Sequence, residues 1–434
     1  MEMAGFWYVL MLVFEVLGGC WLDKKLWGKF YTPYFFLSVP YLVVVLFTIL
    51  VSGHFGLVSF YYPSLLPWIA GLPMFLLASV VFYGCSRKLK PYPGRLYGTA
   101  LIESVSPTLT WRLPFAFLVF LILFARLVVL MFDKDLSCAV GSECFGDLFA
   151  SHGVWGHLLL LALSFMIFFE ACFENPLNDS KWVFSNKNHW LWIVFLLLLM
   201  LTLIHQVKNW IILPVLAGLL ARFISGRKFK WTYVLWMGLG GIAVFFLSYI
   251  VIYLAGDSMF SDPTFGGQLK EIFGLLVHYV TSGTLGLSLD MQQGVIETID
   301  PHYVLTPFYN IWYTLTGQEL VSGYSPDFLH TGLNYTNVRT FFGTLFVYMG
   351  KGGLVWMSFL CGILGYLTLW LWRRYGGLVF LCVYAWVLVI LCMGWFNSYV
   401  QLLATWEVPF WILAAGLVDR FYLKRVRTFA RSRN

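Results

Sequence analysis

The chain alternates long apolar runs with short polar segments. A run needs about 20 mainly apolar residues to cross a bilayer, because every backbone amide in hydrocarbon must be paired within its own helix. On that criterion we count about eleven runs. They cover residues 3–21, 34–52, 67–84, 114–132, 156–173, 190–206, 209–224, 233–254, 353–372, 376–394 and 405–420. This pattern predicts an all-α, polytopic integral membrane protein with about eleven transmembrane helices.

The amino-acid composition excludes several other classes of protein. Of the 434 residues, 60% are hydrophobic and 11% are charged, whereas a soluble domain has about 25% charged residues. The aromatic share of 20% excludes disorder, collagen and coiled coil. The net charge of +7 does not indicate nucleic-acid binding, because the basic residues lie in short clusters between apolar runs.

The distribution of charge predicts the orientation. If the connections alternate sides, most of the 28 Lys and Arg residues face one compartment, which the positive-inside rule assigns to the cytoplasm. These segments are 22–33, 85–113, 174–189, 225–232, 373–375 and 421–434. We therefore expect an N-terminus outside the cytoplasm and a cytoplasmic C-terminus. The first run lacks a basic n-region, so we expect a retained helix rather than a signal peptide.

The longest segment between runs is residues 255–352, which we expect to form a periplasmic loop or cap between spans 8 and 9. It divides the chain into 1–254 with eight spans, 255–352, and 353–434 with three spans and a basic tail. Residues 268–280 have apolar positions at helical spacing, and 340–349 is a second such stretch. We expect both to form helices that lie in the membrane interface or dip into the bilayer.

Aromatic side chains in this loop alternate with carboxylates, amides and glycines. Sugars present CH faces that stack on rings and hydroxyls that need directional partners. We therefore select Tyr309, Trp312, Tyr335 and Asn337 as glycan-binding candidates. An interfacial aromatic belt that holds the loop against lipid headgroups is the alternative.

A short stretch of the loop brings together Asp327, His330 and Arg339. A carboxylate or imidazole can deprotonate an acceptor hydroxyl, and an arginine can neutralise a departing diphosphate. His278 is an equal candidate for the base. We therefore select all four residues as catalytic candidates. Structural hydrogen bonding is the alternative for each histidine.

Outward-facing cations are few, and they lie at membrane boundaries. Arg339, Lys351 and Lys208 are candidates to bind a lipid-linked diphosphate, although headgroup snorkelling also accounts for the lysines. Arg126 lies within a predicted span, where an arginine costs about 2.5–3.5 kcal/mol. It is a fourth candidate for diphosphate binding, and an ion pair with Glu170 or Glu15 is the alternative.

The cysteines and histidines show no metal-ligand spacing, so we expect no metal site. Cys138 and Cys144 lie in a predicted outward loop, where an oxidising periplasm permits a disulfide. Whether they are bonded depends on the loop geometry, which the sequence leaves open.

The order of these parts resembles the bacterial oligosaccharide repeat-unit polymerases, the O-antigen polymerase (Wzy) family. The likeness covers most of the chain as architecture, and its sequence core is Asn334 to Leu354. There an Asn/Thr-rich turn leads through Thr340 and an aromatic stretch to Gly350-Lys351-Gly352-Gly353 and an apolar run. Met349 stands where the family commonly has Asp, and Lys208 where it often has Arg.

This resemblance implies a bacterial inner-membrane glycosyltransferase, with a periplasmic N-terminus, that polymerises undecaprenyl-diphosphate-linked repeat units at the periplasmic face, without cofactor or metal. It further implies a flippase and a chain-length regulator as partners. The nearest rival is an O-antigen ligase, which moves a finished chain onto a lipid A core. A flippase or transporter is less favoured, because the sequence shows no internal repeat.

Overall fold

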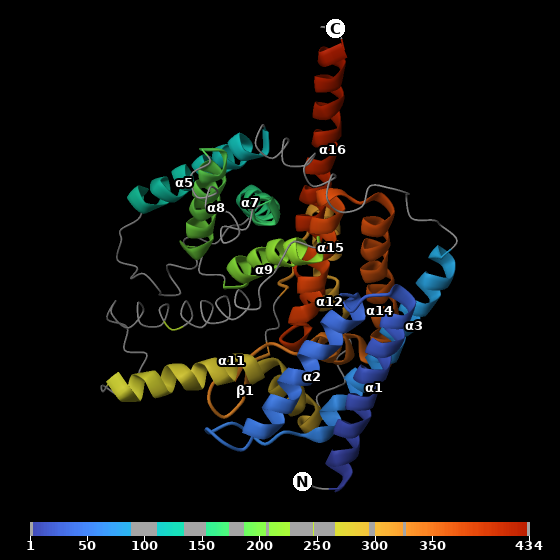
Figure 1. Cartoon of the computed structure of the whole chain (residues 1–434). Helices are drawn as coiled ribbons and strands as arrows, with labels where there is room; N and C mark the ends of the chain where they lie inside the picture. The colour runs from blue at the N-terminus through green and yellow to red at the C-terminus, as the bar shows by residue number, and fades with distance from the viewer. Residues whose placement is uncertain are drawn as a thin grey trace. The chain divides into compact units, whose positions relative to one another are not determined.

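In the computed structural model (Figure 1), the described part of the chain is almost entirely helical. The structure describes residues 3–87, 111–133, 153–172, 186–204, 208–225, 246, 265–294, 300–323 and 327–431. Within them is one small antiparallel sheet formed by β1 (Leu329–His330) and β2 (Tyr335–Thr336). The predicted all-α class is confirmed for this part of the chain.

The helices follow the predicted apolar runs. They are α1 (Met3–Trp27), α2 (Pro33–Val51), α3 (Leu66–Ser86), α5 (Leu113–Asp133), α7 (Val154–Cys172), α8 (Asn186–Ile204), α9 (Lys208–Ile224), α11 (Phe265–Gln293), α12 (Pro301–Val304), α13 (Thr306–Thr316), α14 (Phe341–Tyr375), α15 (Gly377–Cys392) and α16 (Leu403–Arg431). Ten of the eleven predicted runs contain one of these helices. Of the remaining run, 233–254, only residue 246 is described, and Cys138 and Cys144 lie outside the described residues.

Within the described ranges, eight helices are long and apolar enough to cross a membrane. The chain is therefore a multi-pass membrane protein. These eight include α11, which lies in the segment predicted to be outside the membrane, whereas α8 and α9 contain only shorter apolar stretches. The total of eleven spans and the orientation stay predictions.

Local sequence explains several helix ends. Thr32 caps α2, accepting a hydrogen bond from the Phe35 N–H, and Pro33 occupies the first helical position, where its missing N–H costs nothing. Gly317, with φ of 70°, ends α13 in the left-handed conformation that glycine adopts most easily. Gly350 has φ of 67° and kinks α14. The predicted helix at 340–349 is therefore the first arm of α14.

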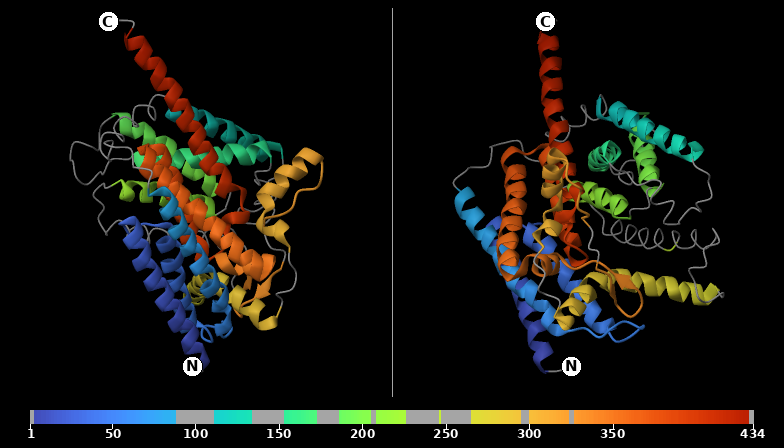
Figure 2. Two further views of the ribbon diagram at one scale, coloured as in Figure 1. Left: turned by 90° about the vertical axis from the view of Figure 1, so that its right-hand side faces the viewer. Right: turned by 180° about the vertical axis from the view of Figure 1, so that it is seen from behind.

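The described chain divides into two compact units. The first comprises Met1–Lys90, Phe260–Trp370 and Val387–Thr405. In it α1, α2 and α3 pack against one another, and α11 contacts α2. Figures 1 and 2 show α11 running across the direction of α1 and α3. If α1 and α3 cross the bilayer, this orientation places α11 along the membrane plane.

The second unit comprises Pro91–Met259, Leu371–Trp386 and Trp406–Asn434. Here α5, α7, α8 and α9 pack together. Glu170, one of the two predicted partners of Arg126, forms an ion pair with Arg222 at 3.0 Å. The Arg126 guanidinium lies 4.9 Å from the centre of the Trp155 ring.

Candidate functional site

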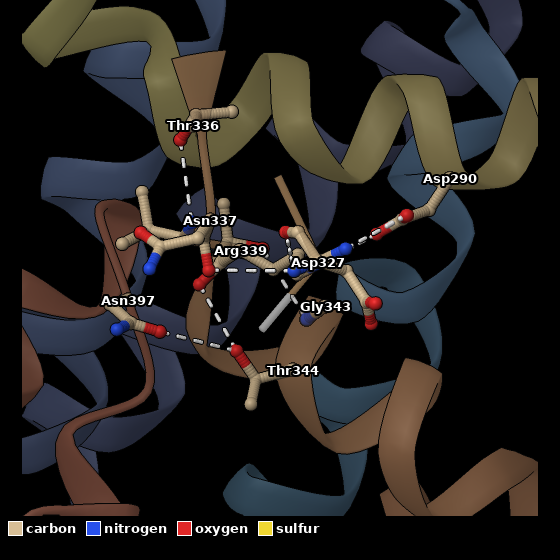
Figure 3. A network of polar contacts seen from close by, with 10 residues as sticks. Asp290, Asp327, Thr336, Asn337, Arg339, Gly343, Thr344 and Asn397 are labelled. Atoms are coloured by element: carbon tan, nitrogen blue, oxygen red, sulfur yellow. Dashed lines mark hydrogen bonds and ion pairs between the residues drawn. The ribbon is translucent and has the colours of Figure 1, made fainter. Parts of the chain in front are cut away.

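The first unit contains a buried ion pair between Arg339 and Asp290 (Figure 3). The guanidinium donates from Nε to Asp290 Oδ2 at 2.6 Å and from Nη2 to Oδ1 at 3.1 Å. Only 3% of the Arg339 side chain and 1% of the Asp290 side chain are exposed. This two-pronged geometry fixes the direction of the guanidinium plane as well as its position.

The third nitrogen of Arg339, Nη1, faces backbone carbonyls. It donates to the oxygens of Asp327 and Asn337, each at 3.4 Å, and the guanidinium carbon lies 5.7 Å from the centre of the Tyr348 ring. Burial by itself lowers the pKa of Arg339, but the hydrogen bonds and negative charge of Asp290 outweigh it and raise that pKa above its ordinary value. Arg339 is therefore a permanent cation beneath the segment 327–337.

The start of α14 holds Arg339 in place. Thr340 Oγ1 accepts hydrogen bonds from the Gly343 N–H at 3.3 Å and from Trp68 Nε1 at 2.8 Å. The Thr344 hydroxyl, one turn later, lies 3.1 Å from the backbone oxygen of Arg339. These bonds cap the helix and join it to α3, so the residue before the cap has little freedom.

A second polar layer continues from Thr344 into the connection between α15 and α16. Thr344 Oγ1 lies 3.4 Å from Asn397 Oδ1, which also accepts from Gln401 Nε2 at 3.3 Å. Gln401 Nε2 lies 3.4 Å from the Tyr303 hydroxyl, and the Tyr303 ring is 4.2 Å from the Tyr348 ring. This chain of contacts connects α12 to the surroundings of Arg339.

Glycines on α11 allow the backbone of other segments to approach this helix closely. A Cβ atom at Gly286 would lie 2.5 Å from the carbonyl oxygen of Val338, and one at Gly283 would overlap the carbonyl oxygen of Phe396. A larger residue at either position would have to displace backbone. Asp290 lies one turn beyond Gly286, so the same close approach brings its carboxylate to Arg339.

The small sheet β1–β2 forms the outer part of the site. Thr331, at its turn, accepts a backbone hydrogen bond from Val58 at 2.9 Å, and its hydroxyl lies 3.0 Å from His278 Nδ1 on α11. The rings of His330 and Tyr335 are 4.9 Å apart. The turn is therefore held from two sides, while His330 and Tyr335 stay exposed.

A family model described as "Family of unknown function (DUF6337)" matches residues 56–425, which is most of the chain. The chain belongs to this family. No curated protein and no solved structure matches it.

The structure brings together most of the residues predicted for catalysis. Asp327 and His330 lie exposed on the segment above Arg339. His278 is buried and reaches the same segment through the turn at Thr331. Residues that are close in the sequence therefore also lie close in space. The buried cation among them, Arg339, is paired with Asp290.

The glycan and diphosphate candidates are more widely spread. Tyr335 and Asn337 belong to the cluster, whereas Tyr309 and Trp312 lie on α13, where 59% of Trp312 is exposed. The exposed Lys351 directly follows the kink at Gly350. Two further candidates belong to the second unit; they are Arg126 on α5 and Lys208, the first residue of α9, whose side chain lies outside the described part.

Sequence analysis did not identify Asp290, Tyr348 or Asn397. Asp290 has a recognisable signal, because it is a carboxylate following the apolar run Leu285–Leu289 in a helix, and such a group usually needs a partner. Tyr348 and Asn397 resemble ordinary aromatic and loop residues. No group of three or more His, Cys, Asp or Glu side chains in the described ranges is arranged to hold a metal ion.

Proposed function

We propose that this protein polymerises undecaprenyl-diphosphate-linked oligosaccharide repeat units into a surface polysaccharide by glycosyl transfer at the periplasmic face. The main support is the cluster around Arg339. A permanent cation lies within a multi-pass helical body, directly beneath an exposed segment that carries Asp327, His330 and Tyr335. A lipid-linked diphosphate sugar presents an anion near the membrane and hydroxyls outside it, and these groups match that arrangement.

In this proposal, different residues bind the diphosphate and the sugar of the substrate. Nη1 of Arg339 donates to two backbone carbonyl oxygens at 3.4 Å, and a phosphate oxygen, which carries negative charge, would bind a guanidinium nitrogen more strongly than a neutral carbonyl does. Charge develops on the diphosphate as its bond to the sugar breaks, and a preorganised cation stabilises that charge most where water is excluded. The exposed Asp327, His330 and Tyr335 offer hydrogen bonds and a ring face to the glycan.

An O-antigen ligase would use the same lipid-diphosphate donor, so the acceptor distinguishes the two activities. The resemblance over Asn334 to Leu354 supports the polymerase. A strain that lacks a ligase keeps the polymer on its lipid carrier. A strain that lacks a polymerase makes only single repeat units.

The test is a gel of surface polysaccharide from a strain lacking the gene, beside the complemented strain. We expect the ladder of long chains to disappear while one repeat unit remains attached to the core. Bare core would contradict the polymerase and point to a ligase or a flippase. In the complementing plasmid, Arg339→Ala tests the cluster and Lys270→Ala, an exposed cation on α11, is the matched control.

A further inference from the structure

A histidine–aspartate pair outside the Arg339 cluster lies at the start of α12. Asp300 Oδ1 accepts hydrogen bonds from the backbone N–H of His302 at 3.0 Å and from its ring Nδ1 at 3.1 Å. A carboxylate can only accept, so the hydrogen of the neutral imidazole is on Nδ1. The lone pair is then on Nε2, and 46% of the His302 side chain is exposed.

Two other histidines of this unit, His330 and His278, are bonded differently. His330 Nδ1 accepts from the Gly332 N–H at 3.3 Å, so its neutral ring carries the hydrogen on Nε2 and presents a donor. His278 is buried and uses Nδ1 with the hydroxyl of Thr331. His302 therefore combines an exposed ring with a fixed tautomer that presents an acceptor nitrogen.

An aromatic ring of α13 lies beside the His302 ring, and further aromatic residues follow on that helix. The His302 ring is 4.2 Å from the Tyr309 ring, and Tyr309 is 6.0 Å from Tyr313 on the next turn of α13. Trp312 and Phe308 on the same helix are exposed. Ring faces beside an acceptor nitrogen suit a sugar, whose CH groups stack while one hydroxyl donates a hydrogen bond.

The pair is also joined to the Arg339 cluster. Tyr303 follows His302 directly and its ring is 4.2 Å from that of Tyr348, over which the Arg339 guanidinium lies at 5.7 Å. Two ring contacts thus separate the residue next to His302 from the cation. An acceptor sugar at His302 and a diphosphate at Arg339 would then be bound within the same unit.

We propose that His302 is the general base of the transfer, that Asp300 is its positioning residue, and that the substrate here is the terminal sugar of a lipid-linked acceptor glycan. This inference rests on the proposed function. His302 Nε2 takes the proton of the acceptor hydroxyl while that oxygen bonds to the anomeric carbon of the donor. The bond from that carbon to the diphosphate breaks, its electron pair leaves with the diphosphate, and the imidazolium returns its proton to water.

The test compares elongation rates of purified variants in vesicles supplied with lipid-linked repeat units. His302→Ala should slow elongation by about 10²- to 10⁴-fold, the usual contribution of a general base. Added imidazole should restore part of the rate. His302→Gln, which keeps a hydrogen-bond donor but no basic nitrogen, should be as slow as the alanine variant. Asp300→Asn should slow elongation, and Asp300→Glu should retain most of the rate.

His54→Ala, at another exposed histidine of the same unit, is the matched control and should elongate normally. Elongation by His302→Ala within twofold of wild type, or a loss that imidazole does not restore, would overturn the assignment of the base. If wild-type protein makes no polymer from the same substrates, the proposed function fails instead, so the two failures are distinguishable.

Discussion

At the scale of single residues, the chemistry of the site depends on how Arg339 is neutralised. A buried arginine with no counter-ion would be strongly destabilising, and the two-pronged bond from Asp290 removes that cost. Nη1 of the same guanidinium donates to the backbone oxygens of Asp327 and Asn337 at 3.4 Å. Under the proposed function, Arg339 has a structural role and also binds the diphosphate.

Replacing either partner alone should destabilise the protein. Asp290→Leu leaves an uncompensated buried cation and Arg339→Met an uncompensated buried carboxylate, so each should lower the free energy of unfolding by about 3–5 kcal/mol. The double variant should recover most of that loss because no lone charge remains. Thermal unfolding midpoints in detergent, followed by tryptophan fluorescence, measure both effects.

The double variant also separates stability from catalysis. Although it should fold, it lacks the cation, so we expect one-repeat products without long chains on a polysaccharide gel. Normal chain length in a folded double variant would remove Arg339 from the mechanism. Lys270→Ala, which deletes an exposed cation from α11, should change neither readout.

At the scale of elements, the close approach of α11 to the backbone before α14 sets the geometry of the site. The span 281–290 of α11 is buried throughout, although it contains threonines, serines, glycines and an aspartate. Many side chains in this span are small, so the backbone of Val338 lies directly against α11. The helix then serves as a rigid support for the segment that ends at Arg339.

Gly286→Ala should disturb this support. The new Cβ would lie 2.5 Å from the Val338 oxygen, so the backbone beside Arg339 must shift. Overpacking of this kind costs about 1–3 kcal/mol, and we expect a lower unfolding temperature together with shorter polysaccharide chains. Gly266→Ala on the same helix meets open space and is the matched control. Wild-type stability of Gly286→Ala would contradict this account of α11.

Helices were largely predictable from sequence because apolar runs determine them. The site was predictable only in part. Asp327, His330 and Arg339 are close in the chain, so their proximity in space follows from sequence. The contact between Arg339 and Asp290 joins residues that are 49 positions apart and depends on how α11 packs, which no local pattern specifies.

At the scale of the whole molecule, the proposed function requires the Arg339 cluster to face the periplasm. Length and composition permit α11 to cross the membrane. Such a crossing would move the segment after it to the opposite side from residues 255–264. Because α11 runs across α1 and α3 within the first unit, we expect it to lie along the interface instead.

Cysteine labelling in intact cells tests this topology. Leu320 is 64% exposed, so Leu320→Cys should react with a membrane-impermeant maleimide added from outside. Native Cys85 is exposed at the predicted cytoplasmic end of α3 and should react only after permeabilisation. A fluorescent protein fused after Asn434 should fluoresce, as expected for a cytoplasmic C-terminus. Labelling of Leu320→Cys only after permeabilisation would contradict the periplasmic placement.

The most direct measurement is elongation by the purified protein in vesicles that contain only lipid-linked repeat units. The account predicts lipid-linked chains of increasing length, with one undecaprenyl diphosphate released for each unit added. Transfer that occurs only when a lipid A core is supplied, or no transfer at all from competent substrates, would contradict it.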